Sequence, residues 1–173
     1  MIAYTYDTSG RVLTGTVDGN ASHTNSFVKT YHTDGQILSE KWANSVSDAR
    51  SFVRTFHTDN QILTETWANS ASNAASFVRT FHTDNQVASF KLANSTTNPL
   101  SWVATFDGSN RKTAMVYATD NTAAQSWTAT YDADGRRTEL KYSNDADDDR
   151  SYLKTYDADG RVTSAQWGDT NHS

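Results

Sequence analysis

The chain repeats itself every 25 residues without an insertion or a deletion, and this period constrains its fold more than any other feature. The repeats begin at Met1, Ser26, Ser51, Ser76, Ser101, Ser126 and Ser151, and the last one stops two residues short. An internal period of about 20 to 50 residues indicates an array in which each repeat packs against its neighbours. We therefore predict a single repeat domain over residues 1–173, with repeats 1–25, 26–50, 51–75, 76–100, 101–125, 126–150 and 151–173.

Each repeat has the residues of a β-hairpin. Position 5 is Thr in all seven repeats and position 6 is always Tyr or Phe, and β-branched and aromatic residues favour a strand. A second such run follows a turn, as in residues 37–42 and 62–67. Between the runs, position 10 holds only Gly or Asn, which tolerate the positive φ of a type I turn with a G1 bulge. These turn residues are Gly10, Gly35, Asn60, Asn85, Asn110, Gly135 and Gly160.

Positions 7 and 11 change together, as expected of two side chains that face each other across a hairpin. Four repeats pair Asp with Arg, at Asp7 and Arg11, Asp107 and Arg111, Asp132 and Arg136, and Asp157 and Arg161. The other three pair His with Gln, at His32 and Gln36, His57 and Gln61, and His82 and Gln86. This register places positions 2, 4, 6, 12, 14 and 16 on one face of the sheet and the odd positions, including 17, on the other.

Both predicted faces contain apolar side chains, so a sheet with one solvated face is not expected. We predict an all-β fold of seven tandem hairpins that form a coiled or closed antiparallel sheet. The alternative is a β-solenoid with one coil per repeat. In either arrangement the seven Thr of position 5 are expected to form a buried ladder, and Ser of position 1 is expected at a strand edge.

The composition excludes several classes of function. There are no cysteines, so disulfides, Cys-ligated zinc and thiol catalysis are absent. The net charge is −5 with no basic cluster, which argues against nucleic acid as a partner. No apolar run is long enough for a membrane span, so membrane insertion is not expected, and no secretion signal lies in this chain.

A short motif links the chain to a known family. Residues 131–136, with the sequence YDADGR, recur at 156–161 and more loosely at 6–11, and they resemble the YD repeat of Rhs-type bacterial proteins. In that family the repeats form β-hairpins in a long strip within large secreted or surface-exposed bacterial proteins. The resemblance therefore implies an extracellular or cell-surface location and a structural role. In that family the strip can also form the wall of a hollow shell around toxin cargo. This chain departs from the family in its strict 25-residue period and in being too short to enclose such cargo.

The aromatic residues near the end of the second strand are the main ligand-binding candidates. Flat rings beside polar side chains can stack on sugar rings while the polar groups bind hydroxyls. The candidates are Trp42, Trp67, Trp167, Tyr117 and Tyr142. The competing interpretation is that these rings fill the core, because only 36% of the residues are hydrophobic.

Other potential sites are weaker. The column of His32, His57 and His82 invites a metal site, but hairpin spacing would hold equivalent residues about 9 to 10 Å apart, too far to share an ion. We predict no metal site there. The acidic run at residues 144–149 could bind Ca²⁺, although it lacks a complete calcium-loop motif and suits a solvated loop. No asymmetric catalytic constellation is present, so we predict that the protein is not an enzyme and needs no cofactor.

The sequence thus predicts a non-catalytic extracellular module for adhesion or carbohydrate binding within a larger bacterial protein. Its expected partner is a polysaccharide or a cell-surface glycan. The alternative is a purely structural or self-associating scaffold or spacer, because open terminal strands invite association with further copies. A calcium-stabilised module is a third, less favoured interpretation.

Overall fold

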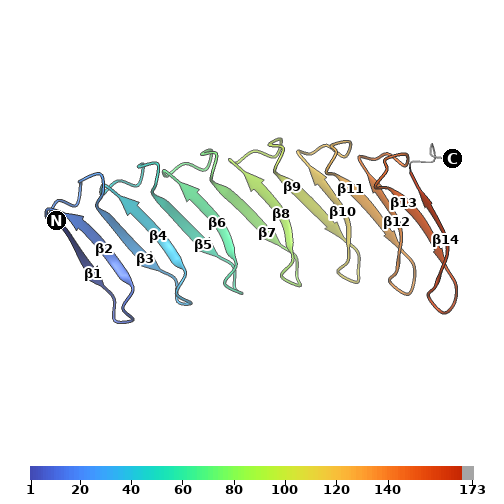
Figure 1. Ribbon diagram of the computed structural model, residues 1–173, viewed down its shortest axis with the longest axis horizontal. Helices are drawn as coiled ribbons and strands as arrows, with labels where there is room; N and C mark the ends of the chain where they lie inside the picture. Colours follow the sequence, from blue (N-terminus) through green and yellow to red (C-terminus); the bar gives the residue numbers. More distant parts are fainter. Residues whose placement is uncertain (169–173) are drawn as a thin grey trace. The chain divides into compact units, whose positions relative to one another are not determined.

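The computed structural model describes residues 1–168, which form fourteen β-strands and no helix (Figure 1). The strands are β1 (Ile2–Tyr6), β2 (Val12–Val17), β3 (Phe27–Tyr31), β4 (Ile37–Trp42), β5 (Phe52–Phe56), β6 (Ile62–Trp67), β7 (Phe77–Phe81), β8 (Val87–Leu92), β9 (Trp102–Phe106), β10 (Lys112–Tyr117), β11 (Trp127–Tyr131), β12 (Arg137–Tyr142), β13 (Tyr152–Tyr156) and β14 (Val162–Trp167). Accordingly, nothing in the described part of the chain could cross a membrane as a helix.

The strands belong to one antiparallel sheet in which they follow one another in chain order. This order confirms the seven tandem hairpins and replaces the alternative of one solenoid coil per repeat. The order ends at β1 and β14, and no ladder joins these two strands within residues 1–168. The predicted closed form of the sheet is therefore wrong.

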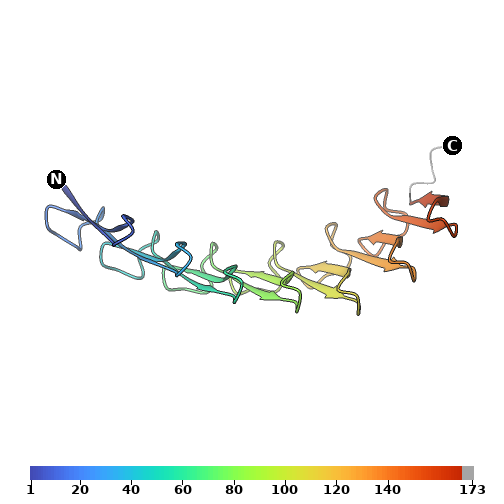
Figure 2. The same cartoon turned by 90° about the horizontal axis from the view of Figure 1, so that it is seen from below.

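The chain divides into two compact units. The first comprises Met1–Thr80 and Lys91–Ser95, and the second comprises Phe81–Phe90 and Thr96–Ser173. The prediction of a single domain stays a prediction. In both units the loops between hairpins stand away from the strand layer, as Figure 2 shows.

The hairpin turn has the predicted geometry. In the first repeat the Asp7 N–H donates to the Arg11 carbonyl at 2.9 Å, and the Gly10 N–H donates to the Asp7 carbonyl at 3.0 Å. Position 10 has a positive φ in all seven repeats, from 61° at Asn110 to 91° at Gly35. These features confirm the type I turn with a G1 bulge, and they explain why only Gly and Asn occur there.

A second bulge, at position 13, was not predicted and changes the faces of the sheet. In the second repeat Tyr31 lies opposite Ile37, whereas Thr30 lies opposite Ser39, so Leu38 has no partner of its own. Because one extra residue reverses the alternation of side chains, positions 14 to 17 lie on the faces opposite to those predicted. Trp42 therefore shares a face with Phe27.

We name the two faces by their repeat positions. The aromatic face carries positions 2, 4, 6, 12, 15 and 17, and the threonine face carries positions 3, 5, 14 and 16. The Thr of position 5 is exposed in every repeat, so the predicted buried ladder is wrong. Its hydroxyl hydrogen-bonds instead across the hairpin, as between Thr30 and Ser39 at 2.6 Å.

The connections between hairpins are ordered by a second turn. Ala43 and Asn44 have φ values of 49° and 51°, and the Ser45 N–H donates to the Trp42 carbonyl at 2.8 Å. Two consecutive left-handed residues define a type I′ turn, which reverses the chain directly after the strand. Equivalent positive-φ pairs follow β2, β6, β8, β10 and β12.

Candidate functional sites at the repeat junctions

A buried serine joins each hairpin to the loop before it. The six Ser of position 1, namely Ser26, Ser51, Ser76, Ser101, Ser126 and Ser151, are only 1–2% exposed. The Ser51 hydroxyl accepts the Trp42 N–H at 2.8 Å and donates to the Ser45 carbonyl at 2.7 Å. It thus satisfies two backbone groups that the loop would otherwise bury unpaired. The prediction of a simple strand-edge serine missed this role, although invariance within the chain was a visible signal.

In the Asp–Arg repeats the turn pair extends into the next repeat. Arg11 Nε lies 2.6 Å from Asp7 Oδ2, and the Arg11 guanidinium sits 4.4 Å above the ring of Tyr31. The Tyr31 hydroxyl in turn donates to the Val12 carbonyl at 2.7 Å. A cation over an aromatic face and a hydrogen bond therefore act together at one junction.

The same arrangement recurs in the second compact unit. Arg111 pairs with Asp107 at 2.7 Å and lies 4.5 Å above the Tyr131 ring, whose hydroxyl donates to the Lys112 carbonyl at 2.9 Å. The junction geometry is therefore a property of the repeat and not of one place in the chain.

The His–Gln repeats use a different carboxylate. In the second repeat Asp34, at position 9, accepts the Gln36 backbone N–H at 3.0 Å and the Gln36 side-chain amide at 2.7 Å. His32 Nδ1 lies 3.0 Å from the same carboxylate. Asp59 and Asp84 occupy the corresponding places beside His57 and His82. The His and Gln side chains are therefore connected through an aspartate, a residue that reasoning from positions 7 and 11 alone left out.

The histidines also face the next repeat. His32 stacks on Phe56 with ring centroids 4.2 Å apart, and His82 stacks on Phe106 at the same distance. A rule follows for position 6: it is Tyr after an Asp–Arg repeat, as at Tyr31, and Phe after a His–Gln repeat, as at Phe56. The sequence obeys this rule at all six junctions. This signal is present in the sequence, but covariation within a single repeat does not reveal it, because the two positions belong to neighbouring repeats.

The turn carboxylates are held in their charged form. The Arg11 backbone N–H, followed by the Arg11 side chain, keeps the pKa of Asp7 below its ordinary value despite partial desolvation. The Gln36 backbone N–H, followed by its side-chain amide, lowers the pKa of Asp34 in the same way. Hydrogen bonds to an ionised carboxylate have this effect because protonation would weaken them. These aspartates therefore serve the turns as anions.

The sequence-predicted ring candidates of the first unit are engaged in packing. The Trp42 ring lies 5.1 Å from that of Phe27, and the Arg50 guanidinium sits 4.4 Å above it. The Trp67 ring lies 4.9 Å from that of Phe52, and its indole N–H donates to Glu65 at 2.6 Å.

The candidates of the second unit differ in exposure. Trp167 lies 5.1 Å from Tyr152 and is about half exposed. Tyr142 lies under the Arg150 guanidinium at 4.3 Å, and Tyr117 is half-buried. The structure does not bring the five rings into one site, and their role in sugar binding stays a prediction.

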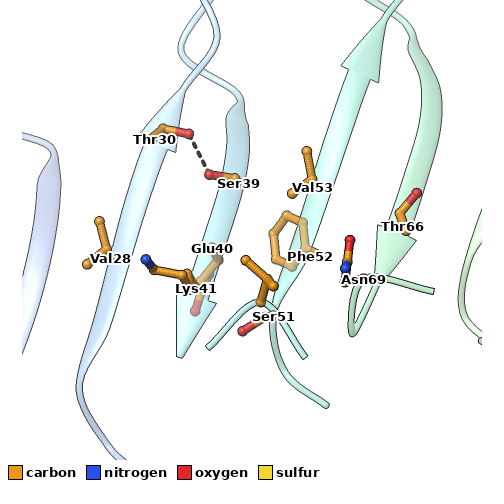
Figure 3. Close-up of a pocket in the computed structure, with 11 residues that line it drawn as sticks. Val28, Thr30, Ser39, Glu40, Lys41, Ser51, Phe52, Val53, Thr66 and Asn69 are labelled. Carbon is orange, nitrogen blue, oxygen red and sulfur yellow. Dashed lines mark hydrogen bonds between the residues drawn. The ribbon is translucent and has the colours of Figure 1, made fainter. Parts of the chain in front are cut away.

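A groove opens on the threonine face between neighbouring hairpins of the first unit (Figure 3). Only two residue pairs join β4 to β5, Ser39 with Val53 and Glu40 with Phe52, whereas five join β5 to β6. The strands can therefore separate beyond these pairs. The groove has a volume of about 490 Å³ and is lined by exposed Val28, Val46 and Val53, by Lys41 and by the hydroxyls of Thr30, Ser39 and Thr66.

The second unit has a groove at the same repeat positions. It measures about 190 Å³, and Lys141, Ala146, Leu153 and Gln166 replace Lys41, Val46, Val53 and Thr66. Trp167 also lines this groove, beside Tyr152. A concave surface that combines apolar and polar groups is suited to a ligand, and its recurrence follows from the repeat.

The acidic run has local partners. The Asp148 carboxylate accepts from the Arg150 guanidinium at 2.6 Å, and Asp145 accepts the Asp147 N–H at 2.9 Å. No cluster of three or more potential metal-ligating side chains occurs in the part of the chain that the structure describes. Calcium binding stays a prediction.

The comparisons with known proteins place the chain in no family. No family model and no curated protein matches the sequence. Among solved structures, the chain is similar to one described as the crystal structure of TcdB2-TccC3-TEV, with 14% identity and a TM-score of 0.31. The match covers 95% of this chain but only 11% of the other, and it establishes no function.

Proposed function

We propose that the chain is a non-catalytic structural array that serves as a spacer in a larger secreted or surface-exposed bacterial protein. The recurrence of one junction design carries this proposal. The groups that could perform chemistry, namely the histidines, the aspartates and the position 1 serines, occur at repeat positions where they bind turns, loops and neighbouring rings. The resemblance to YD repeats supports the extracellular location.

A spacer must resist extension, and single-molecule pulling from the two termini tests this. We expect the array to release its repeats one after another, with about 80–90 Å of chain freed by each 25-residue repeat. Extension without measurable resistance would contradict the proposal. A single event that frees the whole chain would also contradict it, because that outcome requires a globular core shared by all repeats.

Carbohydrate binding is the second candidate, and the recurrent groove favours it. The groove of the second unit places apolar Leu153 beside Lys141 and Gln166, groups that suit the apolar and hydroxyl faces of a sugar, and Trp167 at its border can report binding. A polysaccharide screen read by tryptophan fluorescence tests it. We expect a glycan that quenches Trp167 to lose affinity in Gln166→Ala, with Gln125→Ala as the control. No binding across the screen would reject this candidate.

A further inference from the structure

The two end strands present surfaces that the interior repeats use for contact with their neighbours. Every residue of β1 is exposed, and so is every residue of β14. Within the described residues, β1 pairs only with β2 and β14 only with β13. An unpaired strand edge is a template for another strand, so each end can accept one.

Tyr6 belongs to the first of these surfaces. Its equivalents Tyr31, Tyr131 and Tyr156 each lie under the arginine of the preceding repeat and donate their hydroxyl to a carbonyl of that repeat. Tyr6 is 57% exposed, and its hydroxyl has no hydrogen bond among residues 1–168. Tyr6 is therefore the same residue type as these junction tyrosines, but it has no preceding repeat whose arginine could cover its ring.

Arg161 belongs to the second surface. The equivalent Arg11, Arg111 and Arg136 pair through Nε with the aspartate of position 7 and cover the next tyrosine. The Arg161 side chain is 77% exposed and pairs instead with Asp159 at 3.1 Å. Among the described residues, its guanidinium covers no ring and remains accessible at this end of the array.

The junction rule makes these two ends compatible. An Asp–Arg repeat is followed by Tyr at position 6 and a His–Gln repeat by Phe. The last repeat is of the Asp–Arg type, with Asp157 and Arg161, and the first repeat carries Tyr6. Had the last repeat contained His and Gln, or the first repeat Phe, the ends would not match.

We infer that the chain associates head to tail with a second copy of itself, so that β14 of one copy pairs with β1 of the next. The interior register between hairpins pairs position 14 with position 3 and position 15 with position 2. Transferred to the new junction, it pairs Ser164 with Ala3 and Ala165 with Ile2. Arg161 then covers Tyr6, whose hydroxyl donates to the Val162 carbonyl.

This junction is weaker than an interior one. Met1 stands where six repeats have the buried serine, so the Trp167 N–H receives no serine hydroxyl from the second copy. Association between separate copies also costs translational freedom that a continuous chain does not lose. The contact is therefore reversible. Because it is heterologous, it can continue from copy to copy.

Sedimentation velocity over a range of concentrations tests the inference on the 173-residue chain. We expect the average mass to rise with concentration. Tyr6→Ala and Arg161→Ala should each weaken association at least tenfold, whereas Lys41→Ala, which removes a cation far from either end, should not. The two end residues are exposed, and circular dichroism should show that both variants stay folded.

Mixing the variants tests the direction of the contact. Tyr6→Ala keeps an intact β14 end and Arg161→Ala keeps an intact β1 end, so an equimolar mixture should form dimers at concentrations at which each variant alone is largely monomeric. A wild-type chain that stays monomeric up to millimolar concentration would overturn the inference. So would association that is equal in all variants. The inference deepens the proposed spacer function, but a monomer that resists pulling would leave that function intact.

Discussion

The serine of position 1 shows how a small polar residue can hold a fold with few buried apolar side chains. Among the described residues of the first unit, Phe52 is the only hydrophobic residue that is buried, whereas Ser26, Ser51 and Ser76 are almost completely inaccessible. Each hydroxyl replaces the water that a loop amide and a loop carbonyl would otherwise need. Stability at the residue scale therefore depends on satisfied polar groups more than on apolar volume.

Ser51→Ala is the direct test of this arrangement. We expect a loss of about 1–3 kcal/mol in the free energy of unfolding, because the Trp42 N–H and the Ser45 carbonyl stay buried without a partner. Urea unfolding followed by tryptophan fluorescence measures it. Ser47→Ala, an exposed serine on the same loop, is the matched control and should change stability by less than about 0.5 kcal/mol. Equal effects of the two substitutions would refute the role of the buried hydroxyl.

The environment of Asp148 leads us to expect that the free energy of unfolding decreases in acid. Hydrogen bonds from the Arg150 side chain, followed by its backbone N–H, lower the pKa of Asp148 to about 2. An unfolded aspartate has a pKa of about 3.9. The carboxylate therefore stabilises the fold fully above that value, and the contribution is lost as the pH falls toward 2.

The urea concentration at the midpoint of unfolding should accordingly decrease as the pH is lowered from 6 to 3. Asp148→Asn should lower the midpoint at pH 6 and reduce its dependence on pH, because the amide cannot ionise. Asp147→Asn, on the same loop, should leave the dependence nearly unchanged. A dependence that is identical in all three proteins would contradict this account.

At the scale of the hairpin, the turn could be predicted because its chemistry is local. Gly or Asn at position 10 specifies a positive φ, and the covarying pair at positions 7 and 11 specifies the register at the turn. The bulge at position 13 could not be predicted, since the residues there, such as Leu38, Leu63 and Thr113, are of types that also occur in regular strands. The bulge moves positions 14 to 17 to the opposite face, so the ring of position 17 leaves the face that carries the position 5 threonines, and these threonines are exposed.

The unpredicted bulge also affected the ligand-binding candidates, because it changes the face on which the rings of position 17 lie. Trp42 was expected on the face opposite to Phe27, but the bulge brings the two rings into contact. The grooves were not predicted, because they arise where β4 and β5 pair over only two residues, and no single residue type records that. The junction rule at position 6 could have been found, since it is written in the sequence alone.

At the junction between the fifth and sixth repeats, the rule that links the turn type to the ring of position 6 can be tested by measuring free energies of unfolding. Replacing Asp107, Ser109 and Arg111 by His, Asp and Gln converts this turn to the His–Gln type. We expect Tyr131→Phe to destabilise the original chain by about 0.5–1.5 kcal/mol, since the hydrogen bond to the Lys112 carbonyl is lost. The converted chain should lose less.

The difference between the two effects is the coupling energy of the junction, and urea unfolding of the four proteins supplies it. Tyr4→Phe, whose exposed hydroxyl has no hydrogen bond among the described residues, is the control for loss of a phenol. An equal effect of Tyr131→Phe in both backgrounds would show that the turn and the ring are independent.

At the scale of the whole molecule, each repeat depends on its neighbours through the same few contacts. Stability in such an array is a sum over repeats and junctions. A repeat should therefore be removable when the new junction is of a matched type, and removal should cost more when the new junction is mismatched. A junction is matched when an Asp–Arg turn is followed by Tyr at position 6, or a His–Gln turn by Phe.

Two deletions of equal length measure this most directly. Removing residues 51–75 places His32 before Phe81, a matched junction, whereas removing residues 26–50 places Arg11 before Phe56, which lacks the hydroxyl that Tyr31 donates to Val12. Urea unfolding should show both proteins folded, with the first more stable by about 1 kcal/mol. Equal stability, or greater stability of the chain that lacks residues 26–50, would contradict the account of neighbouring repeats that recognise each other through these pairs.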